Sequence, residues 1–362
     1  MSEPMSVARE ITPTGRVRLK SISSRAWEHP ADRAALASLR SVPGFDLVLR
    51  KLFGLFPERA LRLIYLGSSI EVGPRQYPRL HALYGETLDI LDAPHHYPLF
   101  LSQNPVVNAG AVGMDQPFIV LNSGTAQLLD DDQLRVVLGH EVGHILSQHV
   151  LYKTMLKLLL RAGLYAFSFP LTGLALLGVI AALMEWDRKS ELSSDRAAAL
   201  TAQNPDQVRQ TLMRMAGGIG DGANLEAFRE QARRYEESSG AIDSAVKTMA
   251  LLGRSHPFPV QRLKELDLWV EAGDYQRVLD GDYPRREDDP KENPWGAWAS
   301  GAEHYADAVK SGTDPMVSWL RGVGDAASDR ASAAMGWFKR KRGGEPAEEA
   351  EPHEDPPEEE QR

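Results

Sequence analysis

Residues 131–150 read D-D-Q-L-R-V-V-L-G-H-E-V-G-H-I-L-S-Q-H-V and combine a strong helical pattern with several reactive side chains. The acidic run from Asp130 to Asp132 provides an N-cap and favourable negative charge where a helix would begin. Apolar residues then recur at the spacing of one helical face. We therefore expect one amphipathic helix whose core-facing stripe comprises Leu134, Val137, Leu138, Val142 and Ile145.

Two histidines, His140 and His144, lie four residues apart in this helix. Four residues are slightly more than one helical turn, so both imidazoles leave the same face and could bind one metal ion. Glu141 lies beside that face, from which its carboxylate could reach a water on the metal without being a ligand. This H-E-x-x-H pattern is typical of zinc peptidases, although an ordinary amphipathic helix with surface histidines also fits it.

Composition limits the classes of protein that this chain can represent. Its 362 residues, 43% of them hydrophobic, suffice for one large domain or two ordinary ones. It has no cysteine, which excludes disulfides and restricts any zinc site to histidine and carboxylate ligands. The net charge of −9 is concentrated after Gly344, where nine acidic residues accompany one basic residue. The remaining body is nearly neutral, so we expect no nucleic-acid partner.

The first 24 residues are polar and basic, with turn-forming Pro4, Pro13 and Gly15. This composition predicts a flexible N-terminal arm. It also lacks the apolar segment of a secretory signal peptide. We therefore expect a cytoplasmic protein, or one at the cytoplasmic face of a membrane.

The order of the predicted elements indicates an α+β fold. Apolar alternation and turn residues predict a small sheet before the central helix, and the sequence after that helix is mainly helical. The predicted strands are residues 62–72, 98–102, 106–112 and 118–121, and the predicted flanking helices include residues 77–92 and a polar-faced helix at 185–199.

A third metal ligand is needed, because a catalytic zinc site uses three protein ligands and leaves a fourth position for water. Glu191 is the best candidate, in the segment E-L-S-S-D that places Asp195 four residues later on the same helical face. Glu191 could bind the metal while Asp195 accepts the second N–H of a ligating histidine. An ordinary solvated acidic pair is the alternative for these two residues.

Residues 162–184 contain no charged side chain and are flanked by Arg161 and Glu185. This stretch is long enough to span a membrane. A single crossing would place His144 and Glu191 on opposite sides of the bilayer, so the segment must turn back, and Pro170 favours a turn. We expect an apolar helical hairpin at about 156–184. It either packs against the protein or inserts part-way into a membrane face, since each arm of about 20 Å is shorter than a ~30 Å hydrocarbon core. A basic stripe on its first arm comprises Lys153, Lys157 and Arg161.

Four blocks occur in a characteristic order. They are Asn108-Ala109 ahead of Asn122-Ser123-Gly124, L-G-H-E-V-G-H-I-L-S-Q-H at 138–149, R-K-S-E-L-S-S-D-R-A at 188–197, and S-H-P-F-P-V-Q-R at 255–262. Together they resemble the HtpX-like and CAAX prenyl endopeptidase-type zinc metallopeptidases, which are gluzincins. The resemblance extends over roughly residues 27–275.

This resemblance implies a role for each matching residue. It implies that one zinc ion per chain is bound by His140, His144 and Glu191, and that Glu141 is the general base. It further implies that His256 stabilises the oxyanion, that Asp195 holds a zinc-binding histidine and that Arg262 supports the site. The edge strand that pairs with the substrate backbone would contain Asn108, Ala109 and Gly110.

We therefore expect a zinc-dependent metalloendopeptidase that cleaves proteins or peptides, with a role in protein quality control implied by the family. The alternative is a non-hydrolytic, zinc-stabilised peptide-binding or chaperone-like module, which would have no need of Glu141. A CAAX prenyl endopeptidase is disfavoured, because one apolar stretch cannot build its multispan chamber. Peripheral membrane contact and the oligomeric state stay open.

The expected domain organisation has four parts. They are a flexible arm at 1–24, a zinc metallopeptidase domain at 25–283, a linker with weak amphipathic helices at 284–342 and a disordered acidic tail at 343–362.

Overall fold

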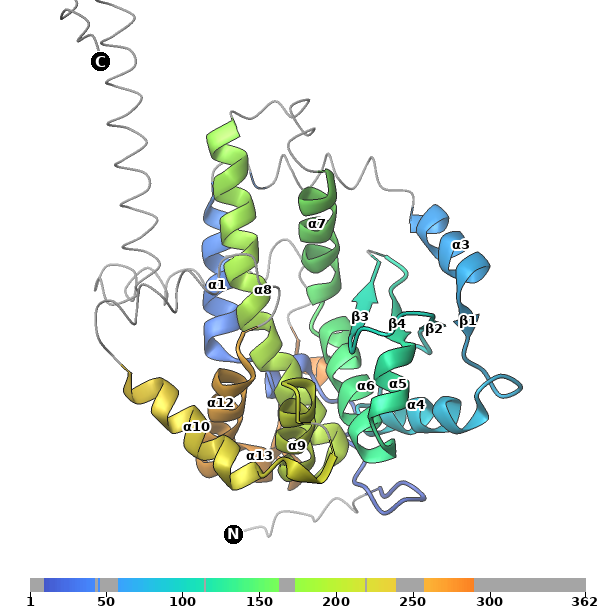
Figure 1. Ribbon diagram of the computed structural model, residues 1–362, viewed down its shortest axis with the longest axis vertical. Helices are drawn as coiled ribbons and strands as arrows, with labels where there is room; N and C mark the ends of the chain where they lie inside the picture. The colour runs from blue at the N-terminus through green and yellow to red at the C-terminus, as the bar shows by residue number, and fades with distance from the viewer. Residues whose placement is uncertain are drawn as a thin grey trace, which may run out of the picture. The chain divides into compact units, whose positions relative to one another are not determined.

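The computed structural model describes residues 10–42, 45, 58–113, 115–162, 173–218, 220–238 and 257–289, all within the unit Met1–Ala302. In this part of the chain a small sheet lies beside a larger group of helices (Figure 1). The predicted α+β class is confirmed, with mostly helical structure and one mixed sheet.

The sheet has four short strands in the order β1-β2-β4-β3. β2 and β4 are parallel, whereas the β1–β2 and β3–β4 pairs are antiparallel. Among the described residues β3 has only β4 as a neighbour, so its other side is an open edge. The bounds are β1 Ile70–Glu71, β2 Leu99–Ser102, β3 Ala109–Val112 and β4 Phe118–Asn122. The last three predicted strands are confirmed, β2 and β3 being shorter than predicted and β4 one residue longer.

The strand predicted at 62–72 is wrong, because helix α3 (Glu58–Ser68) occupies most of it and only β1 follows. Leu61 and Tyr65, one turn apart, pack against the sheet beside Phe100 and Phe118. Leu63, Ile64 and Leu66 are exposed on the other side of the helix. Apolar residues on both faces imitate the continuous apolar run of a buried strand, which explains the error.

The central helix, α6, spans Asp131–Leu146 and starts with a capping box in which Asp130 and Gln133 satisfy each other's backbone N–H groups. Contrary to the prediction of one helix to residue 150, the chain breaks at Gln148, whose φ of 59° is left-handed. A new helix, α7 (His149–Ala162), begins directly after the break. This turn returns His149 toward the face of α6 that carries the other histidines.

Helix α8 (Gly173–Ala202) packs closely on α6. A Cβ on Gly139 would lie 2.6 Å from Thr201 Oγ1, and a Cβ on Gly143 would lie 2.6 Å from the Cβ of Ala197. The two glycines therefore permit the close approach. The polar face predicted at 185–199 exists but is buried rather than solvated, since Ser190, Glu191, Ser193, Ser194 and Asp195 are all inaccessible.

The remaining helices surround this pair. Helix α4 confirms the helix predicted at 77–92, and α9 and α12 contact α8 near the metal-binding candidates. Their bounds are α1 Pro30–Ser41, α4 Pro78–Ile90, α5 Ser123–Leu128, α9 Pro205–Met215, α10 Leu225–Glu237, α12 Pro259–Glu271 and α13 Asp274–Leu279, with short 3-10 turns at Ser24–Ala26, Gly220–Gly222 and Arg286–Asp288.

The flexible arm predicted at 1–24 is wrong for residues 10–24. Leu19 and Ile22 are buried in the main core, and the Leu19 N–H donates to the Ile90 carbonyl at 2.8 Å. The Ser23 N–H donates to the Pro284 carbonyl at 3.0 Å. The predicted linker likewise begins too early, because Arg286 pairs with Asp92 in the folded body. Leu19 and Ile22 are the apolar residues that fix residues 10–24 to the core. Two separated apolar residues form too weak a sequence pattern to distinguish this segment from a flexible tail.

The two arms of the predicted apolar hairpin correspond to α7 and the start of α8, which lie side by side (Figure 1). Residues 163–172, where the turn was expected, lie outside the described part, as do most of the predicted linker and the whole acidic tail. Among the described helices, none combines the length and the apolar character needed to cross a membrane.

Candidate metal centre

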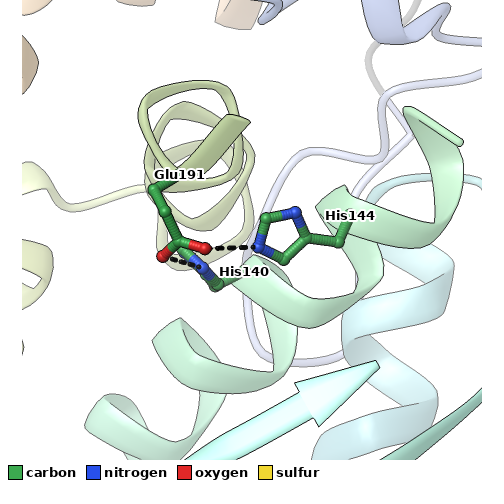
Figure 2. A group of neighbouring side chains, drawn as sticks. All are labelled: His140, His144 and Glu191. Carbon is green, nitrogen blue, oxygen red and sulfur yellow. Dashed lines mark hydrogen bonds and ion pairs between the residues drawn. The ribbon is translucent and has the colours of Figure 1, made fainter. Parts of the chain in front are cut away.

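Three side chains from two helices converge in the core. His140 and His144 project from α6, and Glu191 projects from α8 toward both rings (Figure 2). One ligand atom from each residue lies within 4.8 Å of the other two, and all three residues are buried. Glu191 Oε2 is 3.3 Å from His140 Nε2, and Glu191 Oε1 is 3.2 Å from His144 Nε2. The structure thus assembles the three residues that sequence spacing suggested as a group.

This group fits a metal ion in both chemistry and spacing. Two imidazole nitrogens and one carboxylate oxygen form a donor set of catalytic zinc sites. Ligands about 2.1 Å from a tetrahedral ion lie about 3.4 Å from one another. The separations of 3.2 and 3.3 Å, each to a different oxygen of Glu191, are near that value, and one ligand atom from each residue lies within 4.8 Å of the others, so the group could close around one ion.

A second carboxylate, Asp195, orients His140. Asp195 Oδ1 lies 3.1 Å from His140 Nδ1, on the side of the ring away from Glu191. Arg262 of α12 donates from Nη2 to Asp195 Oδ1 at 2.5 Å and from Nε to Oδ2 at 2.8 Å. Burial disfavours the charge on Asp195, but Arg262 and His140 outweigh it and lower the pKa of that carboxyl. Asp195 therefore stays an acceptor, which keeps a proton on Nδ1 and leaves Nε2 for a metal.

The two histidines differ in proton affinity. Burial lowers the pKa of His140, but Glu191 and Asp195 more than compensate and raise it to about 9. Burial, together with the positive charge of Lys153, lowers the pKa of His144 well below its usual value. Without a bound ion, His144 is therefore neutral at physiological pH, and His140 carries the proton that a metal would displace.

A chain of hydrogen bonds orients His144 from behind. Its Nδ1 lies 3.0 Å from His149 Nδ1 and 2.9 Å from Ser194 Oγ. His149 Nε2 lies 3.0 Å from Asp32 Oδ2. If His144 Nε2 faces a metal, its Nδ1 must donate, and both His149 Nδ1 and Ser194 Oγ are placed to accept. A His149 ring that accepts at Nδ1 donates from Nε2 to the Asp32 carboxylate. His149 and Asp32 are both 2% exposed.

Glu191 is held by Lys153 of α7. The Lys153 ammonium lies 2.6 Å from Glu191 Oε1 and 2.6 Å from Asp187 Oδ1, and all three residues are buried. Burial opposes the charge on Lys153, but the two carboxylates prevail and raise its pKa. Lys153 of the predicted basic stripe on α7 therefore faces the site.

His149, Asp32 and Lys153 are positioned at the site although sequence reasoning missed them. His149 follows His144 by five residues, which on a continuous helix would point its ring away from the metal face. Only the break at Gln148 brings the two rings together. The block at 138–149 ends on His149, and this was the one sequence signal available for it.

Glu141 faces the edge strand of the sheet. Its Oε2 accepts a hydrogen bond of 2.7 Å from the Ala111 backbone N–H. The Asn108 carbonyl accepts from the Asn122 N–H, so alternate residues from Asn108 onward pair with β4. Ala109 and Ala111 consequently direct their backbone groups toward the open edge of β3, beside Glu141.

A cleft at this place connects the strand with the metal-binding candidates. Asn108 and Ala109 line one side of it, with His140, Glu141, Asp195 and Arg262 on the other. Its apolar wall comprises Val136, Val137, Val208, Leu212 and Met215. A peptide lying in the cleft would contact both the strand edge and the polar group.

The structure does not place two of the predicted site residues, His256 and Gly110, in this cleft. His256 belongs to the stretch 239–256, which lies outside the described residues. Gly110 lies on β3 next to Ala109 but borders a second cleft on the other face of the sheet.

Comparison with known proteins identifies the lineage of this site. The sequence model of peptidase family M48 matches residues 74–270, which include α6, α8 and most of α12. The chain belongs to this family. Membership makes the protein a metallopeptidase, and the predicted resemblance to HtpX-like enzymes is confirmed.

Relatives of this M48 peptidase carry matching names. The plastoglobule-localised metallopeptidase 48 of Arabidopsis thaliana chloroplasts is 34% identical over 282 residues, 75% of this chain and 79% of its own. A protease HtpX homologue of Moorella thermoacetica is 25% identical over 41% of this chain and 58% of its own length. Another, from Streptomyces coelicolor, is 27% identical over 51% of this chain and 69% of its own. No solved structure matches the chain.

Proposed function

We propose that this M48 peptidase is a zinc-dependent endopeptidase, with His140, His144 and Glu191 as the ligands of one ion. The observation that carries the proposal is the buried group of two imidazoles and one carboxylate, whose ligand atoms all lie within 4.8 Å of one another. Zinc suits this donor set better than magnesium or calcium, which prefer ligands made of oxygen alone.

When bound, the ion would polarise the scissile carbonyl and acidify a coordinated water. Glu141 is the proposed general base, which takes the proton of the attacking water and passes it to the leaving nitrogen. The Ala111 N–H holds Glu141 Oε2, so the carboxylate is oriented within the cleft. Asp195 and His149 keep the two histidine rings in the tautomers that leave Nε2 for the ion.

The remaining roles concern the substrate. Asn108, Ala109 and Gly110 are proposed to contact the substrate backbone, since β3 has an open edge beside Glu141. Arg262 is proposed to support His140 through Asp195. His256 is proposed to donate to the oxyanion, which rests on the sequence resemblance and on its position six residues before Arg262. A role in protein quality control and a cytoplasmic location remain predictions.

The variant Glu141→Gln tests the proposal. It removes the base while keeping the size of the side chain, so zinc content should match wild type and hydrolysis of casein should fall by at least about 10³-fold. Wild-type cleavage should also stop when a chelator removes the ion and resume with added zinc. Zinc analysis together with cleavage mapping of a proteome measures both effects. Unchanged cleavage by Glu141→Gln would refute the assignment, and zinc-dependent peptide binding without any cleavage would favour the chaperone-like alternative.

A further inference from the structure

A second cleft of about 260 Å³ opens on the face of the sheet opposite the main core. β3 and β4 form its floor at Gly110 and Val120, and α3 forms one wall with Leu61 and Tyr65. The other wall is α7, with Thr154 and Lys157. Of the described residues that line the cleft, Lys157 is the one that carries a charge.

The Lys157 ammonium lies beside Gly110 of the edge strand. Its Nζ lies 3.5 Å from the position that a Cβ on Gly110 would occupy. Among the described residues, no carboxylate forms an ion pair with Lys157, whereas Lys153, one turn earlier, has two. Lys157 is exposed to the cleft, yet burial by the walls and the charge of Lys153 lower its pKa, while Glu141 acts in the opposite direction. An anionic ligand in the cleft would therefore meet an ammonium that no carboxylate of the described residues already neutralises.

The position of this cation matters because Gly110 belongs to the edge strand. A peptide that pairs with the edge of β3 alternates its side chains between the two faces of the sheet. Side chains on the face of Ala109 and Ala111 point toward α6, because those alanines pack with the main core. Side chains on the face of Gly110 point into the second cleft, where Lys157 lies.

We propose that Lys157 is a specificity-determining residue that binds a carboxylate of the substrate in this cleft. The carboxylate belongs to an aspartate or glutamate side chain on the Gly110 face, or to a chain terminus that reaches the same point. This inference rests on the proposed endopeptidase function and extends it to substrate choice.

The test uses internally quenched peptides with blocked termini, in which each position in turn is changed between Glu and Gln. For wild type, kcat/KM for the Glu peptide should exceed kcat/KM for the matching Gln peptide by about 10- to 100-fold at one position. A preference of this size is expected for a hydrogen bond to a charged group. Lys157→Met keeps the aliphatic stem, and the ratio should fall to near one. Lys157→Arg should restore most of it. Lys20→Met is the control. It makes the same substitution at a lysine outside the cleft whose side chain is 73% exposed, and it should keep the wild-type ratio.

A binding measurement separates this inference from the proposed function. In a Glu141→Gln background, fluorescence anisotropy compares the affinities of the Glu and Gln peptides with and without Lys157→Met. A preference for Glu that depends on Lys157 would support the carboxylate site even if no peptide were hydrolysed. Cleavage without any Glu preference, or a preference that survives Lys157→Met, would overturn the inference and leave the peptidase assignment intact. Peptides with free and amidated ends show whether a terminal carboxylate is the group bound.

Discussion

At the scale of single residues, the proposed metal ligands are each fixed by another buried side chain. Asp195 holds His140, His149 holds His144, and Lys153 holds Glu191. Such contacts restrict the ring and carboxylate orientations before an ion arrives, which lowers the entropic cost of binding it.

The contact behind His144 leads to a prediction about metal affinity. Replacing His149 by Leu removes one of the two groups that contact His144 Nδ1 and the histidine partner of Asp32, so zinc affinity should fall by about 10- to 100-fold. Competition with a chromogenic chelator measures this change. Asp89→Asn alters an exposed aspartate paired with Arg18 and serves as the control, with affinity expected to be unchanged. Equal affinities for His149→Leu and wild type would show that the contact has no orienting role.

The raised pKa of His140 predicts that metal binding depends on pH. Because the pKa is raised to about 9, the proton on His140 stabilises the ion-free fold fully below about pH 6.5, and this contribution is lost as pH rises through 9. A metal must displace that proton, so zinc affinity should rise by up to about tenfold per pH unit below 9 and level off above it. Titration calorimetry in buffers of different ionisation enthalpy should detect about one proton released per ion bound at pH 7. Release of no proton would contradict the assigned protonation of His140.

Sequence spacing was sufficient for the residues on regular helices. His140 and His144 are one turn apart on α6, and Glu191 and Asp195 are one turn apart on α8, so periodicity alone placed each pair on one face. Asp32 and Lys153 contact the site from α1 and α7, and no local pattern distinguishes a buried ion pair from a solvated charge. Their roles depend on tertiary packing, which spacing does not encode.

At the scale of secondary structure, the contact between α6 and α8 determines whether the proposed metal ligands meet. Gly143→Ala would place a Cβ 2.6 Å from that of Ala197, and the helices would have to separate. We expect a loss of about 1–3 kcal/mol in the free energy of unfolding, together with weaker zinc binding. Urea denaturation and chelator competition measure the two effects.

Two further variants serve as controls for this prediction. No atom lies within 4 Å of the position that a Cβ on Gly85 of α4 would occupy. Gly85→Ala should therefore stabilise the protein by up to about 1 kcal/mol through helix propensity. Combining Gly143→Ala with Ala197→Gly removes the clash and should recover part of the loss. A Gly143→Ala protein as stable as wild type would show that the helices can separate at no cost.

Elements whose apolar residues match one simple pattern were predicted well. The strands β2 and β4 are short apolar runs beside turn-forming residues, and the helices α4 and α6 carry apolar residues at helical spacing. α3 exposes Leu63 and Ile64 opposite its packed face, which hides its helical period. The break between α6 and α7 has no glycine or proline to announce it, since Gln148 itself adopts the left-handed conformation.

At the scale of the whole folded unit, the N-terminal segment completes the core. Leu19 is fully buried, whereas Ile11 in the same segment is 61% exposed. Leu19→Ala should cost about 2–5 kcal/mol of unfolding free energy, and Ile11→Ala should change it by less than about 0.5 kcal/mol. Chemical denaturation of both variants gives the comparison. Similar stabilities for the two would mean that residues 10–24 are dispensable for folding.

The ion pair between Lys153 and Glu191 has a consequence for communication within the molecule. One carboxylate is shared between an ammonium on α7 and the proposed metal position, so the placement of the hairpin arm and the occupancy of the centre are thermodynamically linked. A change elsewhere on α7 that displaces Lys153 would therefore alter zinc affinity by some factor. Zinc would alter the equilibrium constant of that change by the same factor, because linkage is reciprocal.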